Sequence, residues 1–369
     1  MKYCRLCGEE LPEEARFCAA CGKPQPEAEK SNSQAGIYGN CGETLEPRWK
    51  LCPFCGASLT GGSVHAEEPG TALVPVENRE LAVPDAPEKA GLYAGGAYQG
   101  PLELLDALDW IVMNAEDGGN YRVVLGKDEA VPYVIFQFEG KRITVSLQGD
   151  EHERTVSWEA PIDKPMFAVP SGVTFTLEAG ITLKGLAESG SSVVAVEKGG
   201  NFTMTGGSIS GNSASNKGGG VYVSERGNFI MNGGSISRNS AAYYGGGVFV
   251  SNGGNFIMNG GSISRNSTLY SGGGVFVSNG GNFTMTDGSI SGNSASNKGG
   301  GVFVNLYGIF FKIGKGGVIY GSIAPEGQAN KAQTGAAVYY ANGNKYRNTT
   351  ARVGTVIDTG KDGVAGGWE

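Results

Sequence analysis

Seven cysteines, all among the first 55 of 369 residues, are the side chains with the clearest potential for chemistry in this chain. Cys4 and Cys7 form one Cys-x2-Cys pair, and Cys18 and Cys21 form a second pair after a ten-residue interval. Four thiolates at this spacing can surround one ion tetrahedrally, as Zn²⁺ prefers in structural sites. The spacing predicts a zinc ribbon over residues 1–25 with these four cysteines as metal ligands.

A second unit, residues 37–57, repeats this spacing with one ligand missing. Its cysteines are Cys41, Cys52 and Cys55. Tyr38 occupies the position of the first cysteine, and His65 is the nearest residue that could replace the missing ligand. We expect a degenerate ribbon in which these three cysteines form a zinc site that is weak or empty.

Both units resemble the short bacterial zinc-ribbon domains written CxxCGxxLPxxAxFCxxCG, and the first matches that pattern at every ligand. The resemblance implies one structural zinc ion and a small module that docks to a protein partner. Two disulfides are the competing interpretation, but they need an oxidising compartment, and no signal-peptide pattern precedes the cysteines. We therefore expect a cytoplasmic protein, with display on the cell surface by a non-classical route as the alternative.

The overall composition argues against two classes of partner. Acidic residues outnumber basic ones by 36 to 29, and no basic stripe of the kind that binds a phosphate backbone is present. No apolar run approaches the roughly 18 residues that a membrane helix requires. Neither nucleic acid nor a membrane span is indicated.

The cysteine-free remainder of the chain is built on an internal repeat. Phenylalanines recur every 27 residues, at Phe175, Phe202, Phe229, Phe256, Phe283 and Phe310. Each period holds three short apolar runs, such as 201–204, 208–210 and 220–223. Three strands per period without a helix predict a mainly β fold, a right-handed parallel β-helix in which each strand pairs with its equivalent one coil later. Regular coils are expected over residues 173–305.

Period-two alternation along each strand separates an inner from an outer face. The residues expected inside one coil are Phe202, Met204, Ile209, Val221 and Val223. The asparagines at equivalent turn positions are Asn212, Asn239, Asn266 and Asn293. We expect them to adopt the left-handed conformation and to form a hydrogen-bonded ladder through successive coils.

Outward-facing aromatic residues form the candidate binding surface of the repeats. They are Tyr222, Phe249, Phe276 and Phe303, each between two inward valines. An exposed apolar stripe of this kind binds carbohydrate or protein, whereas a covering segment would make it part of the core. The variable turn before each GGGV motif carries Tyr243, Tyr244 and Tyr270, and Arg238 and Arg265 stack nearby as a solvated face.

The segments around the repeats are expected to link and to cap them. Residues 58–100, rich in Pro, Gly, Ala and Glu, predict a disordered linker. Residues 101–117 predict a capping helix at the start of a β-helix that extends over 101–369. Its apolar stripe is expected to comprise Leu102, Leu105, Leu108, Ile111 or Val112, and Ala115. Residues 306–369 are expected to form irregular last coils and a cap.

The GGGV and FIMN motifs of the repeats resemble those of polymorphic outer-membrane proteins and adhesin-like β-helix families. A polysaccharide-active enzyme needs clustered carboxylates, but between residues 201 and 305 the only acids are Glu225 and Asp287. The acidic QGDEHERT segment, residues 148–155, is interpreted as a polar turn. We therefore expect a non-enzymatic scaffold with a docking head, and an exported adhesin-like or carbohydrate-binding protein as the alternative.

Overall fold

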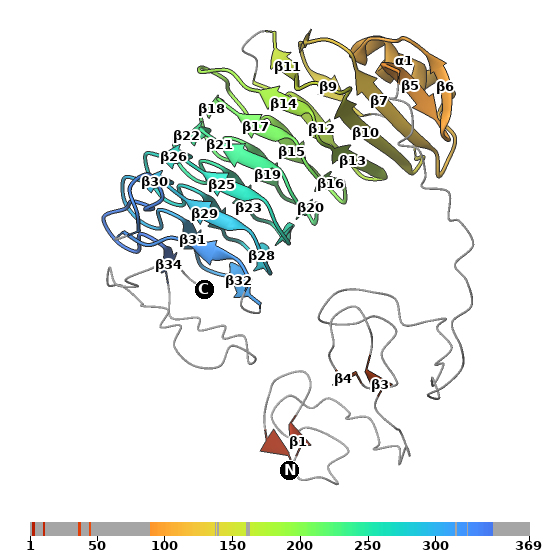
Figure 1. Ribbon diagram of the computed structural model, residues 1–369. Helices are drawn as coiled ribbons and strands as arrows, with labels where there is room; N and C mark the ends of the chain where they lie inside the picture. Colours follow the sequence, from red (N-terminus) through yellow and green to blue (C-terminus); the bar gives the residue numbers. More distant parts are fainter. Residues whose placement is uncertain are drawn as a thin grey trace, which may run out of the picture. The chain divides into compact units, whose positions relative to one another are not determined.

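The computed structural model describes residues 89–341, apart from 137, 139, 160–162, 314–315 and 323, together with four short strands before residue 46. The chain divides into two compact units, Met1–Leu81 and Ala82–Glu369, which are described separately. In the second unit the strands stack into a parallel β-solenoid (Figure 1). The predicted mainly β, parallel β-helical fold is confirmed, while its right-handed sense stays a prediction.

Three long sheets run along the solenoid, and each coil contributes one strand to each. The ten-stranded sheet contains β5 (Gly91–Ala94), β6 (Ala97–Gly100), β7 (Asn120–Leu125), β10 (Ile143–Gly149), β13 (Val173–Leu177), β16 (Asn201–Met204), β20 (Asn228–Met231), β24 (Asn255–Met258), β28 (Asn282–Met285) and β32 (Ile309–Lys312). We call the second sheet the serine sheet, because four of its strands read Ser-Ile-Ser. It contains β8 (Glu129–Val131), β11 (Arg154–Trp158), β14 (Ile181–Lys184), β17 (Ser208–Ser210), β21 (Ser235–Ser237), β25 (Ser262–Ser264), β29 (Ser289–Ser291) and β33 (Val318–Ile319).

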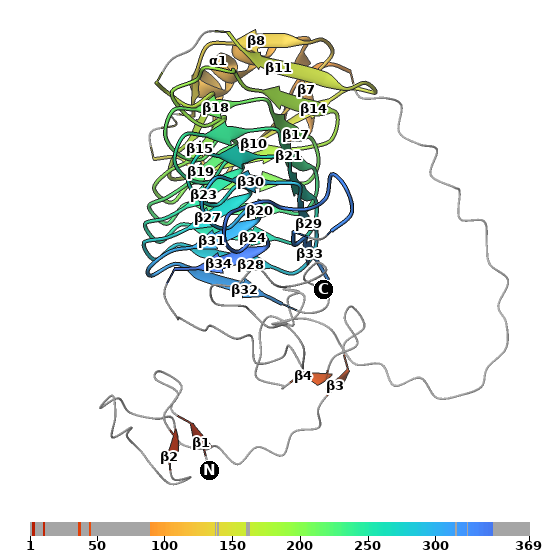
Figure 2. The same ribbon diagram turned by 90° about the vertical axis from the view of Figure 1, so that its left-hand side faces the viewer.

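The valine sheet contains β9 (Val134–Ile135), β12 (Phe167–Val169), β15 (Val194–Val196), β19 (Val221–Val223), β23 (Val248–Val250), β27 (Val275–Val277), β31 (Val302–Val304) and β34 (Val338–Tyr340). A short turn sheet lies between the serine and valine strands of four coils and contains β18 (Ser213–Ala214), β22 (Ser240–Ala241), β26 (Ser267–Thr268) and β30 (Ser294–Ala295). Figure 2 shows the same stack from another side. Eight strands in the serine and valine sheets correspond to about seven turns of the solenoid. We number the coils 1 to 8 from β7, so that coils 4 to 7 begin at β16, β20, β24 and β28.

The core is built by stacking each residue on its equivalent in the next coil. Phe202 pairs in register with Phe229, and their ring centroids lie 5.0 Å apart. The next two steps along this column are 4.6 and 4.7 Å. All five residues predicted to face inward in coil 4 are fully buried. The 27-residue period is therefore a packing requirement, since a shift of one residue would turn every inward side chain outward.

A buried asparagine ladder crosses the turn that follows the serine sheet. The backbone N–H of Asn239 donates to Oδ1 of Asn266 at 3.0 Å, and that of Asn266 donates to Oδ1 of Asn293 at 2.9 Å. The side-chain amide of Asn239 also donates to the carbonyl of Ile209 in the preceding coil, at 3.0 Å. These bonds satisfy polar groups that lie out of reach of water, and they confirm the predicted ladder.

The predicted left-handed conformation of the ladder asparagines is wrong by one position. The preceding residue has the positive φ, at 74° for Gly211 and 55° for both Arg238 and Arg265. Glycine adopts this conformation freely, whereas an L-residue with a side chain pays about 1 kcal/mol or more. The strained backbone conformation therefore falls on the residue before the asparagine. The asparagine amide remains available for hydrogen bonds between coils.

The first coil is covered by a hairpin that lies in the predicted linker. Strand β5 pairs with β6 and, in antiparallel register, with β7, where Leu92 lies opposite Val123. Leu92 is fully buried, so residues 91–100 belong to the solenoid and the linker prediction is wrong there. Pairing β5 with β7 satisfies the edge of the first coil. Residues 58–88 of the predicted linker lie outside the described residues.

Helix α1, Leu104–Asn114, lies within the predicted capping segment and packs on the same end of the solenoid (Figure 1). Its buried face is formed by Leu104, Ala107, Leu108 and Ile111. Leu105, expected on that face, is instead 38% exposed. Of the two alternatives Ile111 and Val112, Ile111 is the buried one and Val112 is 49% exposed. The error arises because two apolar stripes of helical spacing lie side by side, and spacing alone does not select between them. No helix among the described residues is long and apolar enough to cross a membrane.

Coil 8 departs from the 27-residue period, as expected of the last coils. The ladder continues from Asn293 to Asn330, which is 37 residues further along the chain, at 2.8 Å. Two of the ten additional residues lie between β32 and β33 and eight lie between β33 and Asn330, which restores the register. Residues 342–369, predicted to complete the cap, lie outside the described residues.

Replacing Asn239 by alanine tests the ladder. The substitution leaves the Asn212 N–H and the Ile209 carbonyl buried without their partners, so we expect a loss of about 3 kcal/mol in unfolding free energy. Urea titration followed by circular dichroism measures it. Asn259→Ala is the matched control, because the Asn259–Asn232 bond is exposed and its loss should cost less than about 1 kcal/mol. Equal losses in the two variants would contradict a structural role for burial of the ladder.

Candidate functional site: zinc-ribbon hairpins and the outer face of the solenoid

Two short antiparallel hairpins are described in Met1–Leu81, the part of the chain that carries the cysteine motifs. Strand β1 (Lys2–Tyr3) pairs with β2 (Glu10–Leu11), and β3 (Gly36–Ile37) pairs with β4 (Thr44–Leu45). Each strand of the second hairpin begins 34 residues after its counterpart in the first. The same offset relates the cysteine motifs and aligns Tyr38 with Cys4. The described strands and the cysteine motifs thus repeat with the same offset of 34 residues.

The donor set distinguishes the two units. In the sequence, the segment between β1 and β2 contains a complete Cys-x2-Cys pair, whereas the segment between β3 and β4 contains a single thiol. The cysteines themselves, and Tyr38, lie outside the described residues. Four thiolates fit a tetrahedral Zn²⁺. The assignment of Cys4, Cys7, Cys18 and Cys21 as its ligands stays a prediction. Three thiolates leave the second site one ligand short.

The predicted exposed aromatic stripe is present as a column but is not exposed. The rings of Phe249 and Phe276 stack at 5.4 Å, and those of Phe276 and Phe303 at 4.9 Å. These three side chains are only 3%, 2% and 7% exposed, and Tyr222 is half-buried at the start of the column. They form a second, smaller core outside the valine sheet. The prediction that this stripe is an exposed binding surface is therefore wrong.

The glycine turns and their neighbours explain this burial. A Cβ built on Gly272 would lie 2.8 Å from Cβ of Phe276, so only glycine allows the turn to fold against the ring column. One position before the glycines, side chains cover the rings. Tyr244 lies 4.5 Å from the ring of Phe276, and Nζ of Lys217 lies 5.2 Å from that of Phe249. Lysine over an aromatic face is a cation–π contact that the sequence pattern did not reveal.

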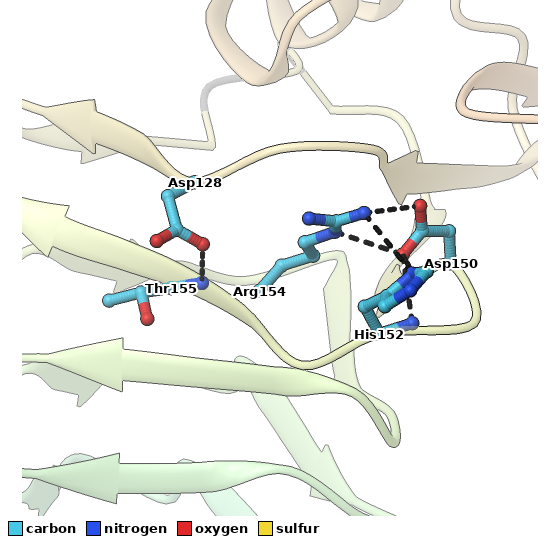
Figure 3. Close-up of polar contacts among 5 residues, drawn as sticks. All are labelled: Asp128, Asp150, His152, Arg154 and Thr155. Atoms are coloured by element: carbon cyan, nitrogen blue, oxygen red, sulfur yellow. Dashed lines mark hydrogen bonds and ion pairs between the residues drawn. The ribbon is translucent and has the colours of Figure 1, made fainter.

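The acidic turn between β10 and β11 carries the only clustered titratable groups singled out from the sequence. Arg154 donates to both carboxylate oxygens of Asp150, at 2.9 and 2.6 Å, and the His152 N–H donates to the same carboxylate at 3.0 Å (Figure 3). Next to it, Asp128 accepts the N–H of Thr155 at 2.8 Å. The turn borders a shallow hollow of about 400 Å³.

The charge pattern of this turn suits a structural role. The Arg154 hydrogen bonds hold the pKa of Asp150 at about 2, well below its usual range. Such a carboxylate is always ionised near neutral pH and already has its partners, so it is a poor general acid or base. The His152 side chain is 71% exposed and lies on the surface of the turn. Among the described residues, no group of three or more His, Cys, Asp or Glu side chains is arranged to hold a metal ion.

Comparison with known proteins gives a match only within Met1–Leu81, the part of the chain that contains both cysteine-rich ribbons. The model of the double zinc ribbon family matches residues 4–56. No curated protein matches the chain, and no solved structure matches it either. The match supports the resemblance drawn from the cysteine spacing, and the double zinc ribbon family implies zinc binding by this segment. The resemblance of the repeats to polymorphic outer-membrane and adhesin-like families stays a prediction.

Zinc content tests the assignment of the two ribbons. We expect about one Zn²⁺ per purified chain. We expect about two in Tyr38→Cys, because that substitution restores a fourth thiolate to the second ribbon, residues 37–57. Elemental analysis by mass spectrometry measures the ratio. Tyr98→Cys, which adds a cysteine on β6 of the solenoid, should leave the zinc content unchanged. Two zinc ions in the unaltered chain would show that Tyr38 costs the second site nothing.

The Asp150–Arg154 pair predicts a defined pH dependence. Because the folded pKa of Asp150 is depressed to about 2, its stabilising contribution is present above about pH 4 and is lost as the pH falls from about 4 to 2. The carboxyl carbon shift of Asp150 in NMR spectra should therefore stay constant down to about pH 3. Asp150→Asn should lower the urea midpoint at pH 7, with a smaller effect near pH 2. A carboxyl that titrates near pH 4 would contradict the ion pair.

Proposed function

We propose that this protein is a non-enzymatic binding scaffold in which the zinc ribbons dock to a protein partner and the β-solenoid presents an extended surface. The observation that carries this proposal is that the side chains of the repeats serve packing and hydrogen bonding within the solenoid. Inward side chains stack in the core, ladder asparagines bond to each other, and only two carboxylates occur in residues 201–305. A rigid array with variable turns is suited to presenting contacts, not to acid–base chemistry.

A polysaccharide-active enzyme is the less favoured proposal. Glycoside hydrolysis uses two carboxyl groups with separate acid and base roles, and the described turn at Asp150 supplies one carboxylate already paired with Arg154. If new reducing ends or unsaturated sugars formed on incubation with polysaccharides, and Asp150→Asn abolished them, the proposal of a non-enzymatic role would fail.

An adhesin-like or carbohydrate-binding protein at the cell surface is the second candidate, and the exposed tyrosines of the solenoid turns favour it. Tyr243 and Tyr270 are 48% and 49% exposed, as is common for side chains that contact a ligand. The cytoplasm remains our proposed location, because thiolate zinc ligands need a reducing environment. Protease treatment of intact producing cells distinguishes the two, since only a displayed solenoid releases peptides from residues 200–305.

The docking role of the ribbons predicts that partner binding depends on zinc. We expect chemical cross-linking in producing cells to capture a protein with the unaltered chain and to lose it at least tenfold in Cys18→Ser, because an unliganded ribbon does not hold its docking surface. Tyr38→Phe is the matched control and should retain the partner. The solenoid should unfold at the same urea concentration in all three proteins. Undiminished capture with Cys18→Ser would contradict the docking role.

A further inference from the structure

The turn between the serine and valine sheets differs in coils 5 and 6 from the coils on either side. Coils 4 and 7 share the segment SGNSASNKG, at residues 210–218 and 291–299. Coils 5 and 6 read SRNSAAYYG and SRNSTLYSG, at 237–245 and 264–272. At the start of the turn arginine replaces glycine, and near its end Ser-Asn-Lys becomes Ala-Tyr-Tyr in coil 5 and Leu-Tyr-Ser in coil 6. In coil 6 threonine also replaces the alanine before this segment. The shared residues between the start and the end of the turn keep the stacking intact.

The arginine end of this turn carries backbone strain. Arg238 and Arg265 both have φ of 55°, where coils 4 and 7 place Gly211 and Gly292. A side chain in the left-handed conformation is disfavoured, and such outliers can reflect a functional use when the rest of the repeat shows that glycine suffices. Arg226 has the same conformation, with φ of 64° where the next coils place Gly253 and Gly280, so positive φ alone does not mark a site. Arg238 and Arg265 differ from it because they occupy equivalent positions in adjacent coils, in the same turns as the exposed Tyr243 and Tyr270.

The two arginines also lack a charge partner in the described structure. Both side chains are exposed, and no described carboxylate forms an ion pair with either. They stack one coil apart, about 4.8 Å by strand spacing. Two arginines whose backbone positions lie this close can both reach one anion that carries carboxylates.

The tyrosine end of the turn forms a cluster of mutually tilted aromatic rings, of which Tyr243 and Tyr270 are exposed. The ring centroids of Tyr243 and Tyr270 lie 6.0 Å apart, and Tyr244 lies within 6.3 Å of both. Tyr244 is anchored on the buried ring of Phe276, so the cluster has a rigid support. Leu269, beside it in the turn, is 71% exposed. The cluster is supported by Phe276 on its inner side and is exposed to solvent at Tyr243 and Tyr270, so these rings can stack against a ligand.

The strands between the two ends exclude one mode of binding. Strand β22 pairs with β18 and β26, and β26 pairs with β22 and β30. A peptide that binds by adding a strand needs a free sheet edge, and neither strand has one. What remains on the surface are hydroxyl groups, among them those of Ser240 and Ser267. They can hydrogen-bond to a ligand that lies flat across the turn.

We propose that the turns of coils 5 and 6 form a binding site for an acidic glycan, a polymer of sugars that bear carboxylates. This inference rests on the proposed binding function of the solenoid and names its ligand. A sugar ring lies with its apolar face on Tyr243 and Tyr270, and its neighbours along the chain cross β22 and β26. Their carboxylates pair with the guanidinium groups of Arg238 and Arg265. The turn spans five residue steps from arginine to tyrosine, at most about 17 Å, which suits a short run of sugars.

The alternatives fit these features less well. Nucleic acid would require a stripe of many basic residues along a phosphate backbone, and the site supplies two. An acidic peptide could neutralise the arginines, but β22 and β26 offer it no free strand edge for main-chain bonds. Exposed aromatic rings combined with hydroxyl groups and two cations match a ring-shaped ligand rich in hydroxyls and carboxylates.

The test uses the full-length chain and a hexamer of galacturonic acid, with its uncharged methyl ester for comparison, in isothermal titration calorimetry. Arg238→Gly/Arg265→Gly should weaken binding of the acid at least about tenfold and leave binding of the ester unchanged, because it removes only the ion pairs. Tyr243→Asn/Tyr270→Asn should weaken both ligands about tenfold, because it removes the exposed rings. Both variants copy residues that coils 4 and 7 already use, so the fold is retained.

Arg226→Gly is the matched control. It also replaces a positive-φ arginine (φ 64°) by glycine, but in the turn between β19 and β20, and should bind both ligands like the unaltered chain. Absence of binding to the hexamer, or an equal loss with Arg226→Gly, would overturn the proposal. Equal affinity for a glutamate hexamer would replace the glycan by an acidic peptide. None of these outcomes bears on zinc-dependent capture by the ribbons, so the two proposals fail separately.

Discussion

Registered stacking of identical residues along the solenoid is the constraint on which the other features of this protein depend. Every inward phenylalanine, isoleucine and valine of coils 4 to 7 contacts its own equivalent, and the ladder asparagines extend this rule to polar groups. A ladder of this kind fixes register more sharply than apolar packing does, since a slip would leave several amides buried and unpaired at once. The near-identity of the coils follows from this rule.

The same constraint decides where function can lie. Strand positions are taken up by packing on both faces of the valine sheet, because the outer aromatic column is itself buried beneath glycine turns. The turns can change their side chains without breaking the stack. Coils 5 and 6 use this freedom, and the strained arginines and exposed tyrosines mark the place. The zinc ribbons add a separate, locally folded recognition unit.

Residue spacing predicted those parts of the structure that depend on periodicity. The 27-residue repeat, the inward faces and the bonds of the ladder followed from alternation and stacking. The hairpin of β5 and β6 was missed because its signal is tertiary: Gly91–Ala94 becomes a strand only where it pairs with β7. The burial of Phe249 was missed because alternation says which way a side chain points, but not what the following turn folds over it.

Hydrogen–deuterium exchange of the full-length chain, read by mass spectrometry, tests the central claim most directly. A stack held by registered pairing and a buried ladder should open as one unit, so peptides from coils 4 to 7 should exchange slowly and together. The backbone amides of Asn239 and Asn266 should be among the slowest, since they donate across coils. Rapid exchange of residues 208–304, or independent opening of single coils, would contradict the account.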